Sequence, residues 1–528
     1  MSLDEKLGQL IMPAHTDLEQ SMELVKSIHV GGFWFAKGEA KQTSTELNSL
    51  QQTSKYPLLI SADFEKGAGT HVDGATDLPI NMSLGASRDT SLAYRAAKLT
   101  AQEARALGVH VNFAPVVDVN NNPKNPIINI RSFGEDPKLV ADMAVEAIRG
   151  YQDNGLLATA KHFPGHGNTS VDSHSRLGAI ETGSKQFESV EIFPYARALE
   201  KTQLAAIMTA HLWVQALDKD TIPATLSHNV LSEYLRRKMG FSGIIFPDAM
   251  VMGAITSHYS IDEVSVQVIQ AGCDILLWPG NPKTAFEALK EAVNRGTISE
   301  ERVNESVRRI LRAKTLVGLH RNRLVDTSQI VLTVGTDRNY AEAKQISGQC
   351  ITLVKDDLKL LPLKPAQKIL VLTLGTRSRN AMITRNLFSF PSDMRKINPD
   401  ILTFELPESY TEADVNRALE LSSGIERVVV AAYVRVIVGM GTVELPNPQR
   451  AFMDRLLSKN PNTTLVSFGN PYIAVSFPNL STYVCAFDNA KALQEVTAEA
   501  LYGKSEFRGK LPVTISDRMR FGDGMTTK

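Results

Sequence analysis

Short apolar runs alternate with longer amphipathic stretches from about residue 7 to residue 318, and this alternation constrains the fold more than any other feature. The apolar runs are candidate strands at 30–35, 58–63, 109–117, 157–162, 205–211, 243–248 and 274–278. The stretches between them have helical periodicity, most clearly at 92–107, 139–154 and 229–238. Strands that are apolar along their whole length and separated by helices are typical of a parallel sheet covered by helices. Seven or eight such units over roughly 300 residues predict a (β/α)8 TIM-type barrel, in which residues 7–12 are either the eighth strand or part of a helix.

A second, shorter alternation of the same kind follows residue 340. Its candidate strands and closing helix are 368–374, 401–406, 427–436, 464–468, 483–487 and 492–502. A helix at 303–317 is expected to end before Gly318, a residue type common just past a helix C-terminus. A chain of 528 residues also exceeds what one hydrophobic core usually supports. We therefore predict a catalytic (β/α)8-type domain at 1–318, a linker at 319–339, and a smaller α/β sandwich domain at 340–528.

The charge balance and the cysteines exclude several classes of protein. Lys plus Arg and Asp plus Glu are equal at 57 each, so no overall field draws the chain to nucleic acid or to an anionic membrane. Cys273, Cys350 and Cys485 are odd in number and far apart, which disfavours a disulfide framework or a metal site. Charges near Met1 occupy the place of a signal peptide's apolar stretch. The charge balance fits a neutral sugar substrate but equally fits most other metabolites. We expect a cytoplasmic protein without a cofactor, although a trimmed leader would leave a periplasmic or secreted location open.

Polar side chains recur where the predicted strands end. They are Asp63 and Glu65, Asp118, Lys161 and His162, His211, and Asp248. Strand ends are generally more polar than strand centres, which accounts for one or two such residues but poorly for a repeated series of Asp, His and Lys. Because catalytic groups of (β/α)8 barrels sit at the carboxyl ends of the strands, we expect the functional site there.

The segment 161–174, KHFPGHGNTSVDSH, holds the densest group of reactive side chains. It contains three histidines, one lysine and one aspartate in fourteen residues, whereas the whole chain has eleven histidines. Gly165 and Gly167 give the loop backbone conformations closed to other residues. If the loop turns back at Asp172 and His174, the carboxylate orients the imidazole and leaves its other nitrogen to exchange a proton. The alternative is a polar surface loop with incidental histidines.

Three other residues suit sugar chemistry, each with an ordinary alternative. Asp248 ends the run GIIFPD and can attack an anomeric carbon to form a covalent glycosyl intermediate, or it can equally cap the next helix. Asp63 can accept hydrogen bonds from sugar hydroxyls, whereas Glu65 is expected to form an ion pair with Lys66 or with a helix. Arg131 offers a forked donor for a hydroxyl pair or a carboxylate, or makes a surface ion pair.

Together these segments resemble the family 3 glycoside hydrolases, and within them the β-N-acetylglucosaminidase branch. The signature of that branch, KHFPGHG followed by DSH, is matched at 161–167 and 172–174. Further matches are NFAPVVDV at 112–119, RSFGEDP at 131–137, PATLS at 223–227 and GFSGIIFPDAM at 240–250. Segments similar to the family's second domain are ITLVKDDLKLLPL at 351–363, GNPY at 469–472 and GKLPVTI at 509–515. The resemblance covers nearly the whole chain.

The resemblance implies an exo-acting, retaining β-N-acetylhexosaminidase that releases terminal N-acetylglucosamine. It implies that Asp248 is the nucleophile, His174 the acid/base, and Asp172 the partner of His174. The residues implied to hold the sugar ring or line the site are Asp63, Arg131, Lys161, His162 and His211. Retaining glycosidases ordinarily pair two carboxyl groups. Because a neutral imidazole does not repel an anionic acceptor, phosphorolysis is an alternative to hydrolysis.

One departure and three rivals remain open. The motif DFEKGAG at 63–69 differs from the family's common D-x-E-G-G-R, since Lys66 replaces a glycine and Ala68 stands at the arginine position, which leaves the leaving-group side in doubt. A metal-dependent hydrolase is disfavoured because the chain has no His-x-His and no His-Glu-x-x-His. The second rival is a family 3 glucosidase or xylosidase, and the third is a catalytically inert sugar-binding protein. The glycine-bearing segment 438–445 either reaches over the barrel or simply connects two elements.

Overall fold

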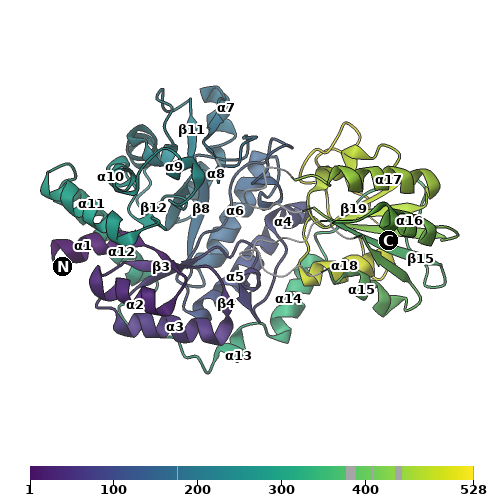
Figure 1. The fold of residues 1–528 in the computed structure, drawn as a ribbon, viewed down its shortest axis with the longest axis horizontal. Helices are drawn as coiled ribbons and strands as arrows, with labels where there is room; N and C mark the ends of the chain where they lie inside the picture. The colour runs from purple at the N-terminus through teal and green to yellow at the C-terminus, as the bar shows by residue number, and fades with distance from the viewer. Residues whose placement is uncertain (175, 376–387, 407–408, 435–442, 527–528) are drawn as a thin grey trace. The chain divides into compact units, whose positions relative to one another are not determined.

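The computed structural model describes residues 1–528 apart from 175, 376–387, 407–408, 435–442 and 527–528, so most of the segment 438–445 lies outside the described residues. The chain forms two compact units (Figure 1). The first contains residues 1–76, 93–119 and 140–336, and the second contains 77–92, 120–139 and 337–528. The chain therefore leaves the first unit twice before its C-terminal part. No helix within these described ranges is long and apolar enough to cross a bilayer.

Short parallel strands form a ring in the first unit. They are β1 Ile11–Met12, β2 Ala14–His15, β3 Gly32–Phe35, β5 Leu59–Ala62, β7 Val111–Asn112, β8 Leu157–Phe163, β10 Ala206–Thr209, β12 Ile244–Phe246 and β13 Leu276–Leu277. One sheet has the order β12-β10-β8-β7-β5-β3-β2, and β13 pairs with β1. The Asp274 N–H donates to Ile245 O (2.9 Å) and so joins β13 to β12. Counting β1 and β2 as one strand interrupted by Pro13, the ring has eight positions, and the predicted (β/α)8 barrel is confirmed.

Helices alternate with these strands along the chain, and most bury one apolar face. They are α1 Leu3–Gln9, α2 Leu18–Ser27, α3 Ala40–Thr53, α5 Thr90–Leu107, α6 Pro137–Gln152, α7 Ser184–Ser189, α8 Phe193–Lys201, α9 Gly253–Thr256, α10 Ile261–Ala271, α11 Pro282–Asn294, α12 Glu300–Leu316 and α13 Ile330–Thr333. The helix predicted at 229–238 is the π-helix η4 Asn229–Lys238, and short 3-10 turns are η1 Ala68–Thr70 and η3 Ala224–Leu226. Two small parallel pairs lie outside the ring, β4 Gly38–Glu39 with β6 Val72–Asp73, and β9 Gly178–Ile180 with β11 Leu212–Val214.

Three segments differ from the sequence-based expectation. The strand expected at 109–117 is regular only over Val111–Asn112, because Pro115 cannot donate to a ladder, although the Val117 N–H still donates to Lys161 O (2.8 Å). Residues 7–12 contain the end of α1, Leu10 and the whole of β1. The stretch 319–339 is not all irregular, since it contains α13 and the first turn of α14 (Asp337–Ser347). The predicted domain boundaries themselves remain a prediction.

The second unit is built on a six-stranded sheet. Its order is β14 Thr352–Asp356, β19 Thr482–Cys485, β18 Thr463–Ser467, β17 Arg427–Tyr433, β15 Ile369–Gly375 and β16 Leu402–Glu405. All neighbours are parallel except β14 and β19. The other helices of this unit are α4 Asn81–Ser87, η2 Asn129–Arg131, α15 Phe390–Ile397, α16 Glu412–Leu421, α17 Asn447–Lys459, η5 Pro471–Ser476 and α18 Lys491–Leu501. This arrangement agrees with the predicted α/β sandwich.

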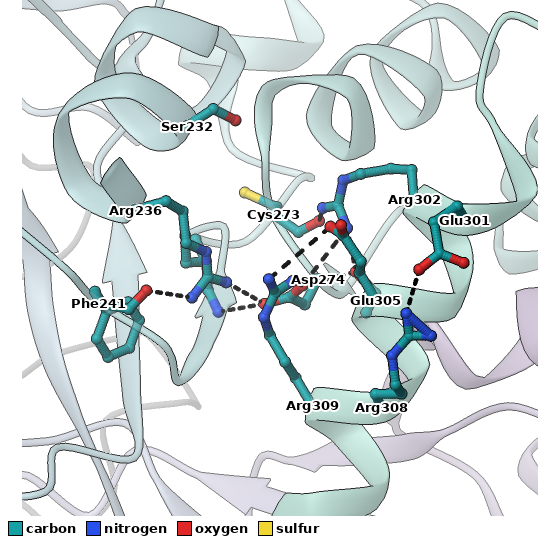
Figure 2. Close-up of polar contacts among 12 residues, drawn as sticks. Ser232, Arg236, Phe241, Cys273, Asp274, Glu301, Arg302, Glu305, Arg308 and Arg309 are labelled. Carbon is teal, nitrogen blue, oxygen red and sulfur yellow. Dashed lines mark hydrogen bonds and ion pairs between the residues drawn. The ribbon is translucent and has the colours of Figure 1, made fainter. Parts of the chain in front are cut away.

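A buried aspartate holds the barrel together at the point where the ring closes (Figure 2). The Asp274 side chain precedes β13 and is fully buried. It accepts hydrogen bonds from Arg236 of η4 (2.6 Å), Arg309 of α12 (2.9 Å) and the Ile245 N–H of β12 (3.0 Å). Ser306 Oγ also donates to it (2.7 Å). One carboxylate therefore ties two strands and two helices that are distant in sequence.

We expect Asp274→Ala to lower the free energy of unfolding of the first unit by about 3–5 kcal/mol, since it removes one partner of a buried ion-pair cluster and leaves charged arginines uncompensated. The matched control is Glu291→Ala, which removes the exposed ion pair with Arg295 and should cost less than about 1 kcal/mol. Urea unfolding followed by tryptophan fluorescence measures this unit selectively, because all three tryptophans lie in it. Equal stability of the two variants would contradict the role of Asp274.

Candidate active site

Asp248 lies two residues after β12, at the carboxyl end of the barrel. Its N–H donates to Thr209 O of the neighbouring strand β10 (3.1 Å), and its Oδ1 accepts from the Ala249 N–H (2.8 Å). Desolvation by the surrounding protein alone would raise the pKa of the carboxyl. Interactions with the neighbouring His162, His211 and His174 and the hydrogen bond from the Ala249 N–H outweigh that effect and lower the pKa of Asp248 to about 2. At neutral pH the group is therefore a carboxylate, the form that a nucleophile requires.

Asp172 and His174 meet side by side within their loop. The His174 Nδ1–H donates to Asp172 Oδ1 (2.8 Å), and the His174 backbone N–H donates to the same oxygen (2.9 Å). The Asp172 side chain is 2% exposed, whereas that of His174 is 30% exposed. Because Nδ1 is engaged with the carboxylate, Nε2 is the nitrogen that can exchange a proton with a ligand.

The loop that carries this pair is bonded to the segment that follows Asp248. The Gly253 N–H donates to His174 O (3.0 Å), and the Ala254 N–H reaches Ser173 O (3.4 Å). Ser173 Oγ also lies 2.9 Å from Nε2 of the buried His166. Desolvation and the neighbouring His162 lower the pKa of His166 to about 4, so His166 is neutral at physiological pH. These bonds couple the position of His174 to that of Asp248 through the chain between β12 and α9.

Lys161, near the end of β8, lies between two carboxylates. Its Nζ donates to Asp63 Oδ1 (2.7 Å) and pairs with Glu65 Oε1 (2.8 Å). The other Asp63 oxygen accepts from Trp34 Nε1 (2.7 Å). Lys161 is 3% exposed at its side chain, whereas Asp63 is 28% exposed. Glu65, for which an ion pair with Lys66 or with a helix is expected, pairs with Lys161 across the barrel end.

Asp118 fixes His162 and the start of the glycine-bearing loop. It is fully buried, its Oδ2 accepts from the His162 Nδ1–H (2.7 Å), and its Oδ1 accepts from the His166 N–H (2.7 Å). Burial opposes ionisation, but His162 and these hydrogen bonds hold the pKa of Asp118 below its usual value. The sequence indicates Asp118 only as a polar residue at the end of a predicted strand. Its role depends on two residues more than forty positions away, which no local pattern identifies.

His211 has both ring nitrogens engaged with protein groups. Nδ1 lies 2.9 Å from Thr225 Oγ1 and Nε2 lies 3.2 Å from Ala249 O, next to Asp248. Its side chain is buried, and burial lowers its pKa. Thr225 belongs to the PATLS segment, whose function the sequence alone did not explain. His211 therefore supports the backbone beside Asp248.

Arg131 is the one predicted site residue that belongs to the second unit. It ends the 3-10 turn η2, and its Nη1 donates to Ile127 O (3.1 Å). The sugar contact expected for it remains a prediction. Within the described part of the chain, no group of three or more His, Cys, Asp or Glu side chains is arranged to hold a metal ion.

The chain matches models of the two domains of one protein family. The glycosyl hydrolase family 3 N-terminal domain matches residues 2–313, and the family's C-terminal domain matches residues 351–523. A protein of Cellulomonas fimi described as a beta-N-acetylglucosaminidase/beta-glucosidase is 30% identical over 97% of this chain and 94% of its own length. Beta-hexosaminidase A of Pseudoalteromonas piscicida is 28% identical over 94% of this chain and 90% of its own length.

Solved structures similar to this chain include enzymes that are named for two different activities. A glycoside hydrolase family 3 beta-N-acetylglucosaminidase from Paenibacillus sp. str. FPU-7 superposes with a TM-score of 0.89 at 32% identity, covering 98% of this chain and 99% of that one. A beta-glucoside phosphorylase superposes with a TM-score of 0.88 at 28% identity, covering 98% of this chain and 94% of that one. The chain therefore shares its fold with enzymes that act on different sugars and with different acceptors.

Proposed function

Because this chain belongs to glycosyl hydrolase family 3, we propose that it is a retaining β-N-acetylhexosaminidase acting on terminal N-acetylglucosamine. The observation that carries the proposal is the Asp172–His174 pair, bonded through its loop to the segment after Asp248. These bonds support the proposal because they connect the residue that we assign to proton transfer, His174, with the carboxylate that we assign as the nucleophile, Asp248. Relatives named as a beta-N-acetylglucosaminidase/beta-glucosidase and as a beta-hexosaminidase, each matched over nearly the whole chain, support an N-acetylhexosaminidase.

The reaction proceeds in two displacements. In the first, the Asp248 carboxylate attacks the anomeric carbon, the bond to the leaving oxygen breaks, and that oxygen takes a proton from His174 Nε2. In the second, water attacks the same carbon, His174 takes the proton of that water, and the bond to Asp248 breaks. Two inversions return the sugar with its original configuration. Asp172 holds the imidazole in place through both steps.

The remaining site residues hold the sugar. Asp63 and Lys161 form one hydroxyl-binding group, in which the carboxylate oxygens accept and the ammonium donates. His162 is oriented by Asp118, while Arg131 offers a forked donor. His211 lines the site, where its Nε2 contacts the backbone oxygen of Ala249 beside Asp248. Lys66 and Ala68 differ from the family's common motif, so we expect the leaving-group side to differ from that of relatives that carry the motif.

Sugar specificity is tested by comparing aryl N-acetylglucosaminide with aryl glucoside. We expect a higher kcat/KM for the N-acetylated substrate, because the Asp-x-His loop marks the N-acetylglucosaminidase branch. The comparison is needed since the Cellulomonas fimi relative carries both names. Preference for the glucoside would contradict the assignment, and failure to turn over either would favour a non-catalytic sugar-binding protein.

Phosphorolysis is the second candidate function, since a similar structure at 28% identity is a beta-glucoside phosphorylase. A neutral imidazole in place of a carboxylate also removes the repulsion that an anionic acceptor would meet. The test is phosphorus NMR of the product formed with and without inorganic phosphate. Accumulation of a sugar 1-phosphate, with faster aryl release, would identify phosphate as the acceptor, whereas free sugar in both cases identifies water.

A further inference from the structure

Trp34 and Trp278 are stacked on one another at the carboxyl end of the barrel, and the reaction described above uses neither. Their ring centroids lie 4.8 Å apart, with the planes 24° from parallel. Trp34, in β3, is only 7% exposed, whereas Trp278, directly after β13, is partly exposed. The pair thus has one member packed inside the protein and one that keeps solvent-accessible surface.

The aromatic pair is bonded to the group that we assign to sugar hydroxyls. Trp34 Nε1 donates to Asp63 Oδ2 (2.7 Å), while Lys161 Nζ donates to Oδ1 (2.7 Å). Each carboxylate oxygen can accept about two hydrogen bonds. These two contacts therefore leave acceptor capacity on a side chain that is 28% exposed. The indole N–H fixes both the carboxylate and the ring plane beside it.

The order of strands shows how the pair reaches the site from two strands that are not adjacent to β8. Trp278 follows β13, which neighbours β12, the strand before Asp248. Trp34 lies in β3, which neighbours β5, the strand before Asp63. The Met250 N–H donates to Leu277 O (3.0 Å), which ties the segment after Asp248 to the end of β13. Lys161 and His162 belong to β8, three positions around the ring from both β3 and β13. A ligand at this end of the barrel therefore has both polar groups and indole surface within reach, and Asp63 connects the two through its bonds to Lys161 and Trp34.

We propose that the Trp34–Trp278 pair is an aromatic platform for the apolar C–H face of the terminal sugar. The pair then contributes to specificity for that sugar, independently of the leaving group. A pyranose with hydroxyls around its edge exposes C–H groups on its faces, and these pack on the electron-rich face of an indole. Sugar sites commonly combine such apolar walls with a few placed polar groups. The inference rests on the proposed function, because it assumes a sugar bound beside Asp63 and Asp248.

The first test is kinetic. Trp278→Ala is expected to raise KM roughly tenfold for good and poor leaving groups alike while kcat changes little, because aromatic packing binds ground state and transition state equally. Trp278→Phe should recover most of the loss by restoring a ring. The control is Trp213→Phe, which changes the third tryptophan, a residue of β11 that donates to Asp218 O, and should leave KM unchanged. An unchanged KM in folded Trp278→Ala would overturn the proposal, as would a loss that depends on the leaving group.

The second test does not require turnover. In the Asp248→Asn protein, titration with N-acetylglucosamine should change the tryptophan emission, and Trp278→Phe in the same background should abolish most of that change. If the parent enzyme cleaves no aryl glycoside, the proposed hydrolysis fails, but a sugar-dependent emission change carried by Trp278 still supports the platform. No emission change with either N-acetylglucosamine or glucose at saturating concentration would overturn it. A melting temperature measured for each variant separates loss of binding from loss of folding.

Discussion

Asp248→Ala is expected to abolish turnover of every glycoside substrate, with kcat lowered by roughly 10⁴-fold or more, the scale seen when a covalent nucleophile is removed. The physical reason is that the glycosyl intermediate forms on this carboxylate. Steady-state rates with an activated aryl N-acetylglucosaminide measure the loss. Asp262→Ala, which removes an exposed carboxylate in the first turn of α10, is the control that should keep full activity.

Two further measurements make this prediction specific. Azide or formate should restore part of the rate of Asp248→Ala, because a small anion can enter the volume of the missing carboxylate and attack the anomeric carbon. Trapping the wild-type enzyme with a 5-fluoro glycosyl donor should label the peptide containing Asp248. A label on any other residue would refute the assignment.

The pKa of Asp248 also predicts a pH dependence. Since that pKa is lowered to about 2, the nucleophile stays ionised throughout the assay range. If kcat/KM falls on the acid side at a pH well above 2, the group that titrates there is not Asp248. The stability that ionised Asp248 contributes is present above the usual Asp value and is lost only as the pH falls towards about 2.

His174→Ala is the second change with a large expected effect, and its size depends on the leaving group. For substrates with poor leaving groups we expect kcat/KM to fall by about 10²–10⁴-fold, the usual contribution of general acid catalysis. For a dinitrophenyl leaving group the loss in the first step should be small, because that oxygen departs without a proton. The measurement is a series of aryl glycosides with leaving groups of increasing basicity.

Asp172→Asn supplies the matched variant for this series. It keeps an oxygen near His174 Nδ1 but removes the charge that compensates a protonated imidazole, so its losses should be intermediate and follow the same trend. Equal loss for good and poor leaving groups in His174→Ala would count against His174 as the acid. Loss with the same pattern in both variants would support the pair acting together.

Several features of this protein follow from local sequence. Near-continuous apolar runs separated by helical stretches specify a parallel barrel, because every strand of such a ring is buried on both faces. Asp63, Lys161, His162, His211 and Asp248 were found from the polar ends of those runs. Asp172 and His174 could be paired because residues two apart meet whenever a loop turns back. Each of these inferences concerns neighbours along the chain.

Other features depend on which distant segments the ring brings together. Three contacts join residues that follow or belong to different strands. They are the bonds of Asp118 to His162 and His166, the position of Lys161 between Asp63 and Glu65, and the stacking of Trp34 on Trp278. The two early excursions into the second unit, 77–92 and 120–139, left no local signal either, and the second of them contains Arg131. The sequence alone determined the barrel and the residue types at its carboxyl end. Only the tertiary structure decided which of those residues touch. Their contacts are set by closure of the ring of strands, and no periodicity along the chain indicates which strands become neighbours.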